Sequence, residues 1–465
     1  MNLTPAFRFV APSARFWAAA VLLFFLRQDS IWGADCDSQQ LTSQQKLERF
    51  HDFDARAQTA MQAKRFAEAV QLYHQGACLA PNSPRALYGL GVAEAALGDF
   101  IEARKSLHAA DALQPTSPLP LVMQVRVNVS LNDIEAIKTN LRDATTRFPQ
   151  DTHLHATLAR FLAEKKLVVL ALAEALRSQR VGPSDTESKV QLAVLENAVG
   201  AYQDAVRNAT AVAEKADVPD PLRASAAGIA GLSHESLGQP DKAIRNLRDA
   251  IRLDPSKENS YLVLADLFEQ SQNYAEAVKI LKQARINIPN STALLLPLGS
   301  DLVRTQQYKE GIDILRELLR QSPDEDQAYL STADAYHQTG DSDHEAQTLR
   351  DLAQRKPNYP MIHVLIARAV LASGHIDYAK ILDELLLAEK SDPLDPDIFY
   401  LRGKVYIAMN RYPDAVAALR RSIELRPMET GRYYQLARIY QKLGESKLAI
   451  EQFQRVKYLE SAPRK

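Results

Sequence analysis

Apolar and small residues recur at spacings of three and four along most of the chain, a pattern typical of amphipathic helices. One run begins at Leu87 and continues with Leu90, Gly91, Ala95 and Leu97. Each run lasts roughly 12 to 15 residues and is followed by a short turn rich in residues that end helices. Such turns include Leu97-Gly98-Asp99-Phe100, Leu237-Gly238-Gln239-Pro240 and Thr339-Gly340-Asp341-Ser342. The pattern predicts an all-α chain made of paired helices.

Prolines mark a regular period along the chain. They stand at Pro81, Pro115, Pro149 and Pro183, then at Pro255, Pro289, Pro323 and Pro357, and finally at Pro393 and Pro427. Most neighbours in this series are separated by the same interval, but the fifth proline comes four positions later than two such intervals would place it, and the ninth comes two positions late. We therefore expect small insertions in the fifth and tenth copies. Because proline cannot continue a helix without losing a hydrogen bond, each one limits the second helix of its pair.

Within each period, small residues stand 24 and 12 positions before the proline. These pairs are Ala57 and Ala69, Gly91 and Ala103, Ala159 and Ala171, Gly231 and Ala243, Ala265 and Ala277, Gly299 and Gly311, and Gly403 and Ala415. A larger residue stands eight positions before the proline, as Tyr73, Leu107, Leu141, Leu247, Leu281, Leu315, Leu349 and Leu419. We expect the small residues to let two helices approach closely and the large residue to fill the space between hairpins.

This arrangement strongly resembles the tetratricopeptide repeat family over roughly residues 42 to 460. The resemblance implies a right-handed α-solenoid of about twelve helix-turn-helix repeats after an N-terminal signal segment. The family's tryptophan near the start of each first helix is replaced, by Leu87, Tyr261, Leu295, Tyr329, Phe399 or Tyr433. The third copy has Val125 and Ile137 at its small positions, and the ninth has Glu345. Pro297 in the eighth copy is expected to kink its first helix or to delay the start of that helix.

The repeat register divides the chain into consecutive segments. They are 1–34, a signal peptide or N-terminal anchor; 35–49, an N-terminal cap; 50–217, repeats 1–5; 218–255, repeat 6; 256–357, repeats 7–9; 358–393, repeat 10 with an insertion; and 394–460, repeats 11–12 with the C-terminal cap. The last predicted helix, from Leu448 to Leu459, has a polar outer face that suits a cap. We therefore expect a monomer or one part of a larger assembly.

The N-terminal segment 1–34 has the pattern of an export signal. Arg8 and Arg15 precede an apolar run from Phe16 to Leu26, which spans only about 16 Å as a helix, roughly half of a bilayer's hydrocarbon core. This length favours a signal peptide cleaved near Ala34 over a transmembrane helix. The bulky residues at 31 and 32 fit a cleavage site poorly, which leaves an uncleaved N-terminal anchor as the alternative. Either outcome predicts a periplasmic or secreted solenoid.

Cys36 and Cys78 are the two cysteines of the sequence. In an oxidising compartment a disulfide between them would close a loop that stabilises the N-terminal cap by roughly 4 kcal/mol. The alternative is a pair of free thiols. Lipid attachment at Cys36 is disfavoured because Asp35 stands where a bacterial lipoprotein signal needs a small residue.

Composition narrows the range of partners. Hydrophobic residues make up 46% of the chain and charged residues 24%, enough apolar surface for a large core. The formal net charge is −1, with acids and bases interspersed, so no broad cationic face is expected. We therefore predict no nucleic-acid binding, and membrane contact only through the N-terminal segment if it is retained.

The sequence contains no arrangement typical of an enzyme or a metal site. His153 and His155 are two positions apart and so point to different faces of a helix, whereas joint metal ligation needs a spacing of four. The acidic stretch from Asp341 to Glu345 lies at a turn, where such residues cap helices. A phosphate-binding glycine loop and a Gly-x-Ser-x-Gly elbow are both missing. We expect no catalysis and no cofactor.

The family pattern places the residue directly after the first small position on the groove formed by the first helices. This residue is basic in five copies, as Arg126, Arg160, Arg368, Lys404 and Arg438. Tyr400 and Tyr434 precede the last two by one helical turn, while Asp266 and Asp334 occupy the position in copies between the basic ends. We call the last three basic residues the basic ladder. Such a ladder beside tyrosines could bind carboxylates through charge-assisted hydrogen bonds. Alternatively, these side chains pair with acids of neighbouring repeats or remain solvated.

The resemblance implies that an extended protein or peptide partner binds along the groove. The asparagine ladder and the lysine and asparagine clamp of other family members are missing, so the resemblance does not identify the partner. The leading hypothesis is an exported scaffold or adaptor for envelope proteins. The alternative is a structural component of an envelope export or polysaccharide-secretion machine.

Overall fold

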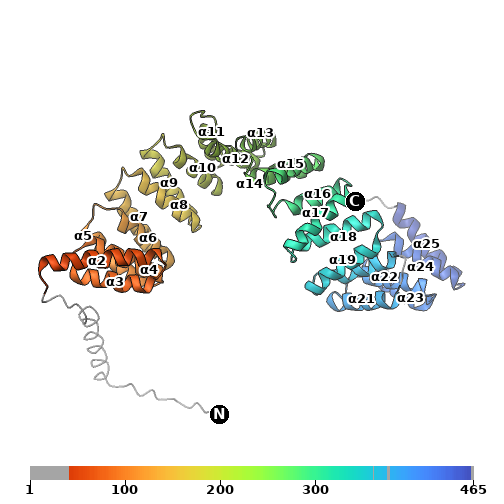
Figure 1. Ribbon diagram of the computed structural model, residues 1–465. Coiled ribbons are helices and arrows are strands. Elements are labelled where there is room, and N and C mark those ends of the chain that lie inside the picture. The colour runs from red at the N-terminus through yellow and green to blue at the C-terminus, as the bar shows by residue number, and fades with distance from the viewer. Residues whose placement is uncertain (1–40, 360, 374–376, 462–465) are drawn as a thin grey trace, which may run out of the picture. The chain divides into compact units, whose positions relative to one another are not determined.

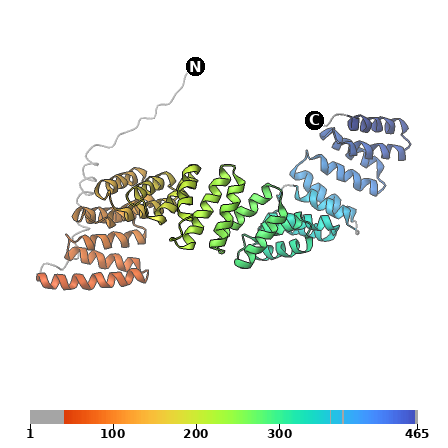
Figure 2. The same ribbon diagram turned by 90° about the horizontal axis from the view of Figure 1, so that it is seen from above.

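The computed structural model describes residues 41–359, 361–373 and 377–461, and within these ranges every regular element is a helix. The chain forms two compact units, Met1–Asn208 and Ala209–Lys465, each drawn as a row of neighbouring helices (Figures 1 and 2). None of the helices in the described part combines the length and the apolar character needed to cross a membrane. The predicted signal segment, residues 1–34, lies outside the described residues.

Unit 1 is built from helical hairpins of repeats 1 to 5. Its helices are α2 (Ser43–Gln62), α3 (Phe66–Leu79), α4 (Pro84–Leu97), α5 (Phe100–Leu113), α6 (Leu119–Ser130), α7 (Ile134–Arg147), α8 (Thr152–Glu164), α9 (Val168–Val181), α10 (Thr186–Ala198) and the start of α11 (Tyr202–Ala213). Each even-numbered helix is the first helix of its repeat, and the odd-numbered helix that follows is the second. We call the surface formed by the first helices of a unit its first-helix face.

Unit 2 continues the same arrangement through repeats 6 to 12. Its hairpins comprise α12 (Asp220–Ser236), α13 (Pro240–Leu253), α14 (Glu258–Gln270), α15 (Tyr274–Asn287), α16 (Leu295–Arg304), α17 (Tyr308–Gln321), α18 (Asp326–Thr339), α19 (Ser342–Arg355), α20 (Ile362–Ala372), α21 (Tyr378–Ser391), α22 (Pro396–Ala408), α23 (Tyr412–Leu425), α24 (Thr430–Lys442) and α25 (Ser446–Ser461). The predicted solenoid of about twelve helix-turn-helix repeats is confirmed.

The turn inside each described hairpin contains a residue in the left-handed region. These residues are Lys64, Gly98, Asn132, Lys166, Gly200, Gly238, Gln272, Gln306, Gly340, Asn410 and Gly444. Most of them follow one another at the period of the repeat, although only five are glycines. The turn geometry is therefore imposed by the packing of the two helices, and lysine or glutamine adopts it despite the preference for glycine.

The small and large positions of the repeat meet as predicted. A Cβ atom added to Gly91, Gly231, Gly299 or Gly403 would lie 2.6 to 2.8 Å from the Cγ atom of the large residue of the same hairpin. The large residues in these four hairpins are Leu107, Leu247, Leu315 and Leu419, and each is fully buried. Burying one leucine contributes roughly 2 kcal/mol, so the repeated contact stabilises every one of these hairpins.

The irregular copies are accommodated by shifts at helix ends. Pro297 delays its helix as expected, because α16 has ten residues whereas α14 has 13. The extra residues before Pro255 lie in repeat 6 and not in the fifth copy as predicted, because they lengthen α12, which has 17 residues. Glu345, which replaces the small residue in repeat 9, is buried and its Oε2 lies 3.1 Å from Nδ1 of His337.

Hairpins of unit 1 contain polar pairs in their interior. Ser106 donates a hydrogen bond of 2.8 Å to Glu94, Asn128 donates one of 2.7 Å to Asn140, and Asn208 donates one of 2.8 Å to Glu196. The two members of each pair are 12 residues apart, on the first and second helix of one repeat. Burial raises the pKa of Glu94 to about 7, although the hydrogen bond from Ser106 opposes the shift. Pairs of this kind, buried at Asn128 and Asn140 and partly buried in the other two hairpins, favour one alignment of the two helices, since another alignment leaves a polar group unpaired.

Candidate partner-binding faces

The five basic residues singled out in the sequence lie on first helices, with their side chains exposed. Arg126 lies on α6 and Arg160 on α8 in unit 1. Arg368, Lys404 and Arg438 lie on α20, α22 and α24 in unit 2. The structure therefore separates them into two groups, and only the second group forms a continuous series on three successive repeats.

The first group contacts aromatic rings of unit 1. The guanidinium carbon of Arg126 lies 5.2 Å from the centre of the Phe161 ring, and Nζ of Lys165 lies 6.0 Å from the same ring. Burial raises the pKa of Tyr88, and the positive charge of Arg126 opposes that shift. Arg160 lines a cavity of about 240 Å³ between α8 and α10. The sequence did not reveal this aromatic environment, because Phe161 and Tyr88 belong to repeats other than that of Arg126.

One member of the second group, Lys404, lies beside a tyrosine singled out in the sequence. Nζ of Lys404 lies 6.0 Å from the centre of the Tyr400 ring, and the guanidinium carbon of Arg432 lies 5.6 Å from it. Tyr434 is 45% exposed and packs edge-on against Phe453, with 5.9 Å between the ring centres. A cation near an aromatic face is held in place by the ring quadrupole, so the Lys404 ammonium group is positioned and still exposed.

None of the five basic side chains forms an ion pair with an acid within the part of the chain that the structure describes. Other bases in the same repeats do form such pairs. Arg147 contacts Asp111 at 2.7 Å, and the buried Arg432 contacts Asp397 at 2.5 Å. The five groove positions are therefore not used for pairing across repeats, and their charges remain available to a partner.

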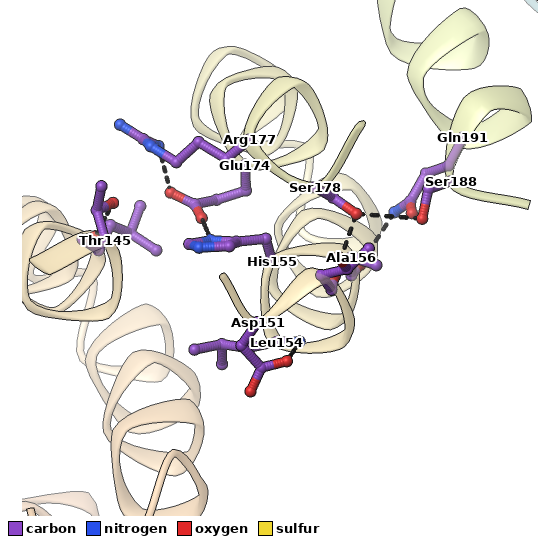
Figure 3. A network of polar contacts seen from close by, with 12 residues as sticks. Thr145, Asp151, Leu154, His155, Ala156, Glu174, Arg177, Ser178, Ser188 and Gln191 are labelled. Atoms are coloured by element: carbon purple, nitrogen blue, oxygen red, sulfur yellow. Dashed lines mark hydrogen bonds and ion pairs between the residues drawn. The ribbon is translucent and has the colours of Figure 1, made fainter. Parts of the chain in front are cut away.

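A buried hydrogen-bonded pair of a histidine and a glutamate lies behind the first-helix face of unit 1 (Figure 3). Nδ1 of His155 on α8 is 2.7 Å from Oε2 of Glu174 on α9, and both side chains are at most 1% exposed. Nη1 of Arg177 is 2.5 Å from the other carboxylate oxygen of Glu174. On the same helix as Glu174, Ser178 donates a hydrogen bond to the backbone carbonyl of Thr152. The network links α9 to α8, the helix that carries Arg160.

Carboxylates gather on the first-helix face of unit 2. Oδ1 of Asp301 and Oε2 of Glu269 each lie 3.4 Å from Nη1 of Arg304. Burial, followed by the negative charge of Glu269, raises the pKa of Asp301 to about 7, and Arg304 opposes the shift. Asp266 and Asp334, noted in the sequence, are exposed and accept hydrogen bonds from glutamines one turn later. The structure thus adds two carboxylates, Glu269 and Asp301, that the repeat pattern did not single out.

The features dismissed as metal sites have structural roles. His155 is buried in its pair with Glu174 while His153 is exposed, so the two rings face different ways. Asp341 caps α19 by accepting a hydrogen bond from the backbone N–H of His344. Among the described residues, no group of three His, Cys, Asp or Glu side chains is arranged to bind a metal ion. The proposed disulfide between Cys36 and Cys78 stays a prediction because Cys36 lies outside the described residues.

Comparison with protein families identifies the repeat. Two family models, both described as "Tetratricopeptide repeat", match the chain. One matches residues 60–120 and 236–296, and the other matches residues 296–360, 365–429 and 400–463. Together they cover more than half of the 465 residues and include the basic ladder.

Several solved structures resemble parts of the chain. The MamA RS-1 ArsTM double mutant is 20% identical, with a TM-score of 0.35 over 37% of this chain and 95% of that chain. A tetratricopeptide repeat protein from Parabacteroides merdae is 15% identical, with a TM-score of 0.36 over 57% and 98% of the two chains. Yeast Tom70 is 15% identical, with a TM-score of 0.33 over 90% and 93%. No curated protein matches the sequence.

Proposed function

The chain belongs to the tetratricopeptide repeat family and is built as a protein-interaction scaffold, and we propose that it acts as an exported adaptor that binds an extended partner segment on its first-helix faces. The observation that carries this proposal is the set of exposed basic side chains without ion pairs on those faces. Many other bases of the described chain pair with an acid of the same or a neighbouring repeat, whereas these five, at one register position, do not.

The basic ladder is the surface best suited to bind carboxylates. Arg368, Lys404 and Arg438 occupy the same repeat position on α20, α22 and α24, so their charges lie in series along unit 2. Tyr400 adds ring surface next to Lys404, and the exposed Tyr434 stands one helical turn before Arg438 on α24. Charge-assisted hydrogen bonds between such bases and carboxylates are stronger than neutral ones. We assign this surface to acidic side chains or a chain terminus of the partner.

Changing Arg368, Lys404 and Arg438 together to alanine is expected to weaken partner capture at least about ten-fold, since each charge-assisted contact contributes about 1.5 to 3 kcal/mol. The measurement is quantitative capture from envelope extract with the chain and the triple variant, alongside circular dichroism. A matched control changes Lys380, Arg421 and Lys447 to alanine, because these exposed bases lie on the second helices α21, α23 and α25.

An equal loss of partner capture in the control variant would mean that capture depends on the net charge of the chain and not on the basic ladder. Unchanged capture by the triple variant would exclude the ladder as the binding surface. If neither the chain nor its variants capture a protein, the chain is better interpreted as a component that binds only inside an assembled export or secretion machine.

Export is proposed from the pattern of residues 1–34. Expression of the full chain in a bacterial host is expected to give a mature protein that begins near Asp35 and is recovered from the periplasm or the medium. Intact mass and N-terminal sequencing measure this directly. Replacing Leu22 and Leu23 with arginine would interrupt the apolar run and is expected to retain the chain in the cytoplasm. A chain that keeps its first residue while fractionating with membranes would instead support the uncleaved anchor.

A further inference from the structure

The first-helix face of repeats 6 to 8 carries a row of acids, in contrast to the basic ladder. We call Glu235 of α12, Asp266 and Glu269 of α14, and Asp301 of α16 the acidic row. Burial raises the pKa of Glu235 and of Glu269, and the negative charge of Asp266 raises both further. Four carboxylates on three successive first helices therefore act on one another as like charges.

The acidic row is not neutralised by the chain itself. Arg304 is the only base that forms an ion pair with the row among the described residues, and it is shared between Glu269 and Asp301. Asp301 is fully buried beside Glu269 and shares Arg304 with it. Asp266 is exposed and Glu235 and Glu269 are half-buried, so these three carboxylates are the ones that a cationic partner can reach.

Leucines form an apolar strip beside the acids. Leu262, Leu296 and Leu330 occupy one register position on α14, α16 and α18, and all three are only partly buried. Leu262 precedes Asp266 by four positions, so both side chains lie on one face of α14. Ser300 of α16 and Ser331 of α18, whose hydroxyl oxygens are 3.1 Å apart, show that these rows adjoin from one repeat to the next. The face therefore presents aliphatic surface bordered by negative charge.

The leucine strip is interrupted in repeat 6, where Gly228 takes the place of leucine. A cavity of about 330 Å³ opens there between α12 and α14, and its lining includes Gly228, Ile229 and Leu232. An added Cβ at Gly228 would lie 3.4 Å from Oγ of Ser260 and 4.0 Å from Cβ of Ala250, which is ordinary contact. The position thus accepts a Cβ atom and borders a cavity that no side chain of repeat 6 fills.

We infer that the first-helix face of repeats 6 to 8 is a docking surface for a cationic, leucine-bearing segment of a partner protein. Arginine or lysine side chains of that segment pair with the accessible members of the acidic row, Glu235, Asp266 and Glu269, and an aliphatic side chain enters the cavity at Gly228. Arg304 already provides one example of this chemistry, because its guanidinium lies between Glu269 and Asp301 and over the Tyr274 ring at 5.0 Å. The inference rests on the proposed function, in which first-helix faces bind proteins, but it concerns a different surface from the basic ladder.

The test uses three synthetic peptides and the full chain. The first peptide alternates leucine with arginine, the second replaces every arginine with glutamate, and the third replaces every leucine with serine. Fluorescence anisotropy is expected to show binding of the first peptide and at least ten-fold weaker binding of the third. The second peptide is measured with the triple alanine variant of the basic ladder, and no binding is expected there, whereas the unchanged ladder would bind its glutamates. Binding of the first peptide is expected to weaken as salt is raised, because exposed ion pairs are screened.

Two variants test the two parts of the surface separately. Asp266→Asn with Glu269→Gln removes charge while keeping side-chain size, and Gly228→Leu fills the cavity with the residue that repeats 7 to 9 carry. Each is expected to weaken binding of the first peptide about ten-fold or more. The matched control is Asp249→Asn with Glu276→Gln, which makes the same charge change on the second helices α13 and α15 and is expected to leave binding unchanged.

The triple alanine variant of the basic ladder separates this inference from the proposed function. It is expected to bind the first peptide as the unchanged chain does, even though it loses the partner captured by the ladder. Equal binding of the leucine and serine peptides, or no loss in the Gly228→Leu chain, would overturn the assignment of the cavity. Absence of binding by the first peptide would overturn the inference as a whole while leaving the ladder result standing.

Discussion

Replacing His155 with leucine is expected to lower the opening free energy of α8 and α9 by about 1 to 3 kcal/mol, the cost of leaving a buried polar group without one of its hydrogen-bond partners. His155 and Glu174 are at most 1% exposed, with Nδ1 and Oε2 2.7 Å apart. The substitution leaves the Glu174 carboxylate inside the hairpin with Arg177 as its remaining charged partner. Hydrogen exchange of the amides in α8 and α9 measures the effect, because a solenoid opens locally rather than as one unit.

A double-substitution cycle separates the contact between His155 and Glu174 from general packing. Glu174→Leu alone is expected to destabilise the hairpin as well, whereas His155→Leu combined with Glu174→Leu should cost much less than the sum of the single changes, because no charge is then left buried. Arg177→Ala is the control, since the Arg177 side chain is 37% exposed and its removal leaves the buried pair intact. Additive losses would show that His155 and Glu174 stabilise the hairpin independently.

The repeat architecture was predictable because each of its determinants is local and recurs. The contact between Gly299 and Leu315, for example, is encoded by two residues at a fixed spacing within one hairpin. The delayed start of α16 follows from Pro297 alone. Even the left-handed turn residues that are not glycine, such as Gln306, stand at the position that the period defines.

The polar network could not be predicted because its members come from different helices without a common spacing. Glu174 and His155 are 19 residues apart, whereas the polar pairs of neighbouring hairpins are 12 residues apart. The sequence drew attention to His155 only as a metal ligand and gave no sign of its buried partner. One signal was present at Asp301, which occupies a register position held by Val127, Phe161 or Leu267 in other repeats. An acidic residue at a register position that is apolar in these other repeats indicates an unusual environment.

The candidate site was predictable in position but not in surroundings. The register placed Arg126 and Lys404 on first helices with exposed side chains, as the structure has them. It could not indicate that Arg126 contacts Phe161 of the next repeat, because this depends on how adjacent hairpins pack. The same dependence explains why Glu269 and Asp301, on successive first helices, were not grouped beforehand.

Asp301→Asn is expected to stabilise α14 and α16 by up to about 4 kcal/mol at pH 7.5 and by much less at pH 4. The pKa of Asp301 in the folded chain is raised from 3.8 to about 7 by burial and by the charge of Glu269. Between these two values the folded chain holds a proton that the unfolded chain has released. Stability contributed by this group is therefore fully present below about pH 4 and is lost as the pH rises toward 7, in total about 4 kcal/mol.

The amide of the Asp301→Asn variant stays uncharged and can donate to Glu269 at every pH. The variant therefore does not lose stability as the pH rises from 4 to 7. Hydrogen exchange of α14 and α16 is compared between the two chains at each pH, which removes the intrinsic pH dependence of exchange. The advantage of the variant should grow from pH 4 to pH 7 and then level off, because above the folded pKa both states have released the proton. Asp334→Asn, at an exposed carboxylate of α18, is the control. A stabilisation that is the same at pH 4 and pH 7.5 would mean that Asp301 is ionised throughout this range. Arg304 would then pair with two ionised carboxylates, Glu269 and Asp301.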